Sequence, residues 1–193
     1  MGAVSYETAL AALSDRLSAR AVEHSVHVAE TAGALAVTYG VDAQAANLAG
    51  LLHDWDRELG DEQLLVAADA AGIELTETDR AVPYLLHART GAMSVGEVLP
   101  ELEPEVLHAI EAHTVGAGEM SDLDKVVYVA DMIAPGRDFP GVEELRGLVG
   151  EGTLHELYLR CYQLTLHHLV ERERPLHPHT VAAWNALVAG DAR

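Results

Sequence analysis

The sequence is poor in cysteine, phenylalanine and lysine, with one of each, Cys161, Phe139 and Lys125. A single cysteine excludes an internal disulfide and a cysteine-rich zinc site. Basic residues are also scarce: 12 Lys and Arg stand against 31 Asp and Glu, a formal net charge of −19. Nucleic-acid binders need a basic surface to neutralise phosphates, and anionic membranes attract basic segments. The composition therefore speaks against both kinds of partner.

Long apolar runs are missing as well. No stretch approaches the roughly 20 apolar residues that a membrane-spanning helix needs. The first residues reach Asp15 before any basic residue, whereas a signal peptide begins with a basic region and an apolar core. We therefore expect a cytoplasmic protein without a membrane partner.

The apolar residues that are present, mainly Ala, Leu and Val, recur at helical spacing, and no stretch alternates with the period of two typical of strands. This pattern predicts an all-α fold, a single domain over residues 1–193 with about eight to ten helices. Caps, glycine stops and prolines place the helices near residues 6–18, 20–40, 42–54, 61–72, 83–100, 104–114, 121–134, 153–173 and 178–190, with a loop and a short helix within 138–149.

The pair His53-Asp54 ends a helix whose preceding residues, NLAGLL, are wholly apolar. Two polar side chains that emerge from a buried helix need a partner, a hydrogen bond or a metal ion. The dipeptide itself is too common to be a motif, and a purely structural role is the competing interpretation.

Four further residues, His24, His87, His113 and Asp131, each interrupt or end an apolar helical face. One such residue is more often a satisfied core group, but imidazoles and carboxylates from several helices can converge in a bundle core. Six nitrogen and oxygen donors without sulfur suit Fe, Mn, Zn or Co. They are enough for two metal ions with Asp54 as the bridge, the arrangement used to cleave phosphoesters and phosphoanhydrides.

The order His, His-Asp, His, His, Asp resembles the HD-domain superfamily of metal phosphohydrolases. The resemblance is closer to the bacterial symmetrical bis(5′-nucleosyl)-tetraphosphatases of the YqeK type and covers about residues 16–186. It rests on RAVEHSVHVAETAGALAVTYG (20–40), AGLLHD (49–54), HARTGA (87–92), AIEAHTVG (109–116), SDLDKVVYVADMIAPGRDFPGVEEL (121–145) and LHPHTVAAWN (176–185).

This resemblance implies a metal-dependent hydrolase that cleaves diadenosine tetraphosphate and related dinucleoside polyphosphates into two nucleoside diphosphates, by attack of a hydroxide that bridges two metal ions. Iron is the metal that the family suggests, with manganese, cobalt or zinc as substitutes. Two alternatives stay open: an HD nucleotidase or phosphodiesterase with another nucleotide substrate, and a nucleotide-binding sensor without catalysis. A homodimer is compatible with the sequence.

Substrate contacts are expected from cations near these motifs. Lys125 and Arg137 are candidate catalytic residues, together with Asp54, and both are candidates for phosphate binding. The competing interpretations are a salt bridge of Lys125 with a nearby acid and a loop-bracing Arg137–Asp138 pair. The remaining candidates for substrate binding are Arg20, Arg57, Thr114 and Asp138.

Arg57 and Asp56, which follow the pair His53-Asp54, have less certain roles. Relatives often have lysine at the position of Arg57, whose planar guanidinium binds differently from a point charge. Asp56 is an added acid next to the site, and we expect it to face solvent, because charges are rarely buried unpaired.

Overall fold

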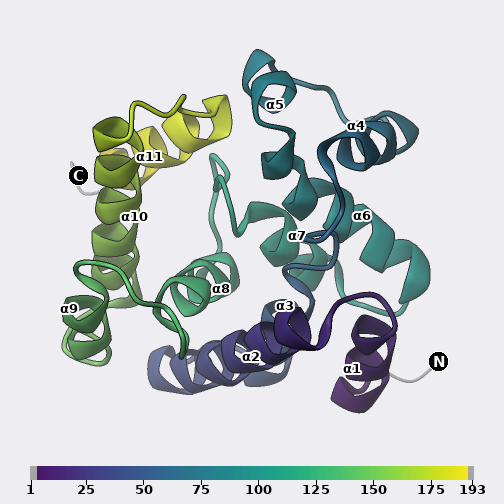
Figure 1. The fold of residues 1–193 in the computed structure, drawn as a ribbon. Coiled ribbons are helices and arrows are strands. Elements are labelled where there is room, and N and C mark those ends of the chain that lie inside the picture. Colours follow the sequence, from purple (N-terminus) through teal and green to yellow (C-terminus); the bar gives the residue numbers. More distant parts are fainter. Residues whose placement is uncertain (1–3, 191–193) are drawn as a thin grey trace.

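The computed structural model describes residues 4–190, and over that range it consists of helices and connecting loops, without strands (Figure 1). The all-α prediction is confirmed. Residues 4–190 contain eleven α-helices, slightly more than the predicted eight to ten, and one short 3₁₀ helix, η1. Their bounds are α1 Tyr6–Ser14, α2 Ala19–Tyr39, α3 Ala43–Leu52, α4 Asp61–Ala70, α5 Glu77–Ala81, η1 Pro83–Leu86, α6 His87–Val98, α7 Pro104–Ala112, α8 Asp122–Ile133, α9 Val142–Gly147, α10 Leu154–Glu171 and α11 Pro178–Gly190.

Local sequence signals explain most of the helix ends. Asp42 caps α3 by accepting hydrogen bonds from two backbone amides, as predicted. Ser121 and Asp124 form the predicted capping box of α8. Gly40 ends α2 in the left-handed conformation, with φ of 73°, which glycine adopts without steric cost. The first helix is shorter than predicted, because it ends at Ser14 rather than near residue 18.

Figure 1 shows α8 between α2 and α10, with α3 and α7 beside it. One large hydrophobic cluster joins these helices, and among its fully or almost fully buried members are Leu35, Leu52, Ile110, Val126 and Tyr158. No helix within residues 4–190 is long and apolar enough to cross a membrane. The organisation as a single domain stays a prediction of the sequence.

The crossing of α2 and α3 depends on Gly50. A Cβ atom at this position would lie 3.0 Å from the Cα of Ala29 on α2, closer than ordinary van der Waals contact. Glycine therefore lets the two backbones approach. The approach brings the end of α3, where His53 and Asp54 follow, toward His24 on α2.

Candidate metal centre

The structure brings the six predicted ligands together from five helices. His24 lies within α2 and Asp131 within α8, while the other four residues lie at helix ends. His53 caps the C-terminus of α3, Asp54 follows it, His87 opens α6 and His113 caps the C-terminus of α7. Because these four residues lie where helices end or begin, their side chains can meet in the space between the helix ends.

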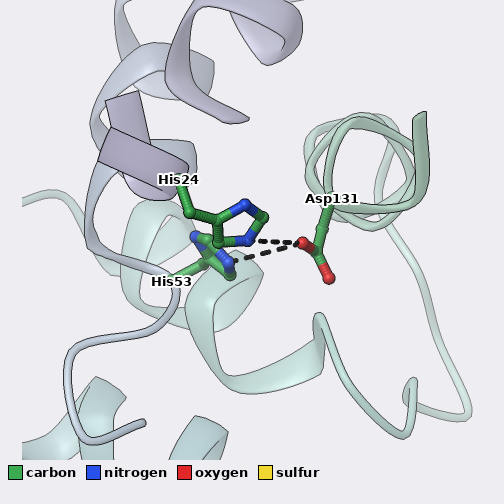
Figure 2. A group of neighbouring side chains, drawn as sticks. All are labelled: His24, His53 and Asp131. Carbon is green, nitrogen blue, oxygen red and sulfur yellow. Dashed lines mark hydrogen bonds and ion pairs between the residues drawn. The ribbon is translucent and has the colours of Figure 1, made fainter. Parts of the chain in front are cut away.

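Two groups share this space. In the first, His24 Nε2 lies 3.0 Å and His53 Nε2 lies 3.6 Å from Oδ1 of Asp131 (Figure 2). Figure 2 shows both imidazoles pointing toward this carboxylate from the opposite side of the site. Asp54 joins the group through Oδ2, which is 3.4 Å from His53 Nε2 and 3.8 Å from His24 Nε2. The donor atoms of His24, His53 and Asp131 all lie within 4.8 Å of one another.

The second group uses the other oxygen of the same carboxylate. Oδ1 of Asp54 lies 3.3 Å from His87 Nε2 and 3.6 Å from His113 Nε2. The two imidazole nitrogens lie 3.2 Å from each other. Asp54 therefore faces both groups, one with each oxygen, which is the geometry of a bridging ligand.

Three of the four histidines are held in one tautomer. The Nδ1 atoms of His53, His87 and His113 lie 2.8, 2.7 and 2.7 Å from the carbonyl oxygen three residues earlier. A carbonyl oxygen can only accept a hydrogen bond, so each Nδ1 carries a proton. In the neutral ring, Nε2 then has a free lone pair that can bind a metal ion. Metal-binding histidines are oriented by this kind of hydrogen bond. In addition, the buried Nε2 of His53 makes no hydrogen bond within the described residues. The donor set therefore fits metal ions.

The electrostatics keep the carboxylates ionised. Burial alone would raise the pKa of Asp54, but the surrounding imidazoles of His53, His113 and His87 hold it well below its ordinary value. The pKa of Asp131 is also held well below its ordinary value, because the hydrogen bond with His24 and the nearby imidazole of His53 outweigh the effect of burial. Burial lowers the pKa of His113 and favours its neutral, ligating form.

Two hollows lie at these residues. The first, of about 250 Å³, is lined by five of the six candidate ligands, all except His53, and also by Tyr84, Tyr128 and Met132. The second, of about 520 Å³, is lined by residues of α2 and of the loop after α8, including Arg20 and Pro135. Four residues line both hollows: His24, Asp54, Arg57 and Arg137.

Several predicted substrate-binding residues lie at these hollows. Arg57 stacks over the ring of Tyr84, 4.2 Å from its centroid, with Nε 3.8 Å from Asp54. Arg137 pairs with the carboxylate of Asp131 and donates from Nε to its carbonyl oxygen at 2.7 Å. Thr114 lines the first hollow, with Oγ1 2.9 Å from Nε2 of His113.

The other predicted contacts lie differently. Arg20 lines the second hollow, which is not lined by His87 or His113. Lys125 lines neither hollow, and its ammonium lies 2.8 Å from Asp122, which is the salt bridge considered as the competing interpretation. Asp138 is exposed and also lines neither hollow.

The expectation that Asp56 faces solvent is wrong. Its side chain is only 2% exposed and pairs with Arg16, a residue 40 positions earlier in the chain. Sequence reasoning also missed Tyr128, Met132 and Thr165 as lining residues of the first hollow. A signal existed for Tyr128, which lies three residues before Asp131 and so on the same face of α8. No signal indicated Thr165, which comes from α10.

Comparisons with known proteins find a matching family and similar sequences. The HD domain family matches residues 21–136. The symmetrical bis(5′-nucleosyl)-tetraphosphatase of Bacillus subtilis is 34% identical over 95% of this chain and 98% of that protein. The enzyme of the same name from Staphylococcus aureus is 30% identical over 93% and 92% of the two chains.

A solved structure is also similar. It is a crystal structure from Clostridium acetobutylicum described as a predicted HD superfamily hydrolase involved in NAD metabolism, with 36% identity and a TM-score of 0.90. The match covers 97% of this chain and 99% of that one. With six converging donors, a family match over more than half of its length and nearly full-length relatives, the chain belongs to the HD domain family, in the group named symmetrical bis(5′-nucleosyl)-tetraphosphatases.

Proposed function

We propose that this protein hydrolyses diadenosine tetraphosphate and related dinucleoside polyphosphates symmetrically, to two nucleoside diphosphates. One observation carries the proposal: the six candidate ligands converge on one centre, where five of them line the first hollow and two of these, His24 and Asp54, also line the second. A substrate with a nucleoside at each end and phosphates in the middle would place its central phosphates at these ligands. The names of the nearly full-length relatives support the same substrate class.

We further propose that the centre holds two metal ions. His24, His53, Asp54 and Asp131 would hold the first, and Asp54, His87 and His113 the second. Such ions supply Lewis-acid chemistry and lower the pKa of water toward neutrality. Nitrogen and oxygen donors suit iron, manganese, cobalt and zinc, and iron is the choice that the family resemblance suggests.

The protein's own groups then bind and orient the substrate. Arg57 and Arg137 stand at the junction of the hollows, where their planar guanidinium groups can each bind two phosphate oxygens. This positive charge is needed locally, because a chain with a net charge of −19 would otherwise repel a polyphosphate. Arg137 also fixes Asp131 and so links phosphate binding to a ligand of the first group.

The hollows would separate the two halves of the substrate. Tyr84 and Tyr128 would form part of the wall around the half that lies in the first hollow. Arg20 would contact the other half in the second. In this assignment Asp138 and Lys125, predicted from the sequence as contacts, lie outside the binding surface. A cytoplasmic location and homodimer formation stay predictions of the sequence.

Product analysis tests the proposal. Protein purified without oxygen and loaded with Fe²⁺ or Mn²⁺ is incubated with diadenosine tetraphosphate, and the products are separated by ion exchange. We expect ADP as the sole product. AMP plus ATP would contradict symmetrical cleavage, and an intact tetraphosphate would indicate another nucleotide substrate. Tight nucleotide binding without turnover would indicate a sensor.

A further inference from the structure

We propose that Arg16 and Asp56 are positioning residues for Asp54, the carboxylate that faces both ligand groups. Asp54 needs such support because α3 ends at Leu52 and the following residues form turns rather than a regular helix. The hydrogen bond from the amide of Arg57 to the carbonyl of Asp54, at 2.9 Å, closes one of these turns. Further contacts to the residues that follow Asp54 come from other segments of the chain.

Arg16 provides the closest of these contacts. Its Nε donates to the carbonyl oxygen of Trp55 at 2.8 Å, its Nη2 pairs with the carboxylate of Asp56, and its guanidinium lies 5.2 Å from the centre of the Trp55 ring. Asp56 is 2% exposed, and a buried carboxylate without a cation is strongly unfavourable. The pair therefore holds the two residues directly after Asp54 against the segment between α1 and α2.

Two more hydrogen-bonded links extend the same connection. Ser18 caps the start of α2 and donates from its amide to Glu58 at 2.8 Å and from its hydroxyl to the same carboxylate at 2.5 Å. The indole N–H of Trp55 donates to Ser94 on α6 at 3.1 Å. The turn after Asp54 is thus attached both to α2, which carries His24, and to α6, which begins with a ligand of the second group.

A displacement of this turn would act on both ligand groups, because each oxygen of Asp54 faces one of them. Residues that orient a ligand without touching the metal typically change metal affinity by about 10- to 100-fold when they are replaced. The inference rests on the metal centre of the proposed function and not on the identity of the substrate.

The test is the double variant Arg16→Met/Asp56→Ala, which removes both charges and so leaves neither one buried and unpaired. The control is Arg160→Met/Glu144→Ala, which removes an exposed pair of the same type, 2.8 Å apart, on α10 and α9. Calorimetric titration with Mn²⁺ measures metal affinity, and thermal unfolding in EDTA measures the stability of the metal-free chain.

We expect both Mn²⁺ affinities of the Arg16/Asp56 variant to fall about tenfold or more, while the control binds like the wild type. A lower unfolding temperature with unchanged Mn²⁺ affinities would show a merely structural pair and overturn the inference, as would the weakening of one Mn²⁺ alone. Failure of the wild-type chain to bind Mn²⁺ would overturn the metal centre itself and with it the proposed function. Wild-type binding without hydrolysis would affect only the assignment of the substrate.

Discussion

The Nε2 atoms of His87 and His113 lie 3.2 Å apart, yet neither neutral ring has a proton to offer the other, because each Nδ1 donates to a backbone carbonyl. The hydroxyl of Thr114 lies within 3.3 Å of both nitrogens but has only one proton to donate. Two facing lone pairs beside the carboxylate of Asp54 are best satisfied by a cation.

Replacement of His87 by alanine tests this pair. We expect the His87→Ala chain to keep one metal ion and lose the other, since the first group does not use His87. Hydrolysis of diadenosine tetraphosphate should fall at least about 100-fold, at the upper end of the losses seen when residues that only support ligands are removed. Metal analysis and product assays measure both effects. His167→Ala, at an exposed position on α10, is the control, and equal metal content in the two variants would contradict the assignment.

Arg137 is expected to contribute to hydrolysis because its guanidinium group donates several hydrogen bonds at once. Arg137→Lys keeps the charge but loses the simultaneous hydrogen bonds to the carbonyl and carboxylate of Asp131. Hydrogen bonds to charged groups contribute about 1.5–3 kcal/mol, so kcat/KM should fall roughly 10- to 100-fold. Steady-state kinetics at saturating metal measure the effect. An Arg160→Lys control should leave kcat/KM unchanged, and wild-type kinetics for Arg137→Lys would contradict the role.

Lys125 should contribute little to hydrolysis, although its sequence context suggested a phosphate contact. Its ammonium pairs with the exposed Asp122, and surface pairs of this kind contribute at most about 1 kcal/mol. We expect Lys125→Met to retain kcat and KM within about a factor of two. A lost phosphate contact of about 1.4 kcal/mol would instead change them about tenfold. A large rise in KM would restore the phosphate-binding hypothesis.

The buried pair of Asp79 and Arg89 makes stability depend on pH. Burial alone would raise the pKa of Asp79, but hydrogen bonds from Arg89 and Thr76 lower it from 3.8 to about 2. The folded state therefore binds this proton less readily than the unfolded state, so the stabilisation is fully present above pH 3.8 and is lost as the pH falls toward 2.

Asp79→Asn should therefore lower the free energy of unfolding at neutral pH by about 3–5 kcal/mol, because Arg89 stays buried without its partner. Its stability should also fall less steeply than that of the wild type between pH 3.8 and 2. Urea unfolding of metal-free chains across this range measures both. The exposed control Asp122→Asn should change stability by less than about 1 kcal/mol. Parallel pH profiles for wild type and Asp79→Asn would exclude a contribution of Asp79 in this range.

Much of the fold could be predicted because its signals are local. Ser121 with Asp124, Asp42 and Gly40 act on backbone groups within a few residues, so the sequence shows their effect directly. The extra helix α5 has five residues, which is too short for a 3.6-residue period to be read from the sequence. The helix α9, with six residues, is predicted only as a short helix within 138–149 for the same reason.

The candidate ligands could be predicted for a related reason: a polar residue on an apolar helical face is visible in the sequence. The burial of Asp56 could not, because it depends on Arg16, 40 residues away. The same holds for His177, whose Nε2 lies 3.2 Å from Asp79, 98 residues earlier. Pairings over such distances are set by the packing of helices and have no spacing that a single sequence displays.

The unequal size of the two hollows has a consequence for how substrates are oriented. A molecule with two identical ends forms the same complex whichever way round it enters, so the asymmetry of the protein is invisible in its products. A dinucleoside tetraphosphate with adenine at one end and guanine at the other has two distinct complexes, one for each orientation. The hollows, about 250 and 520 Å³ in volume, would then favour one orientation of such a substrate over the other.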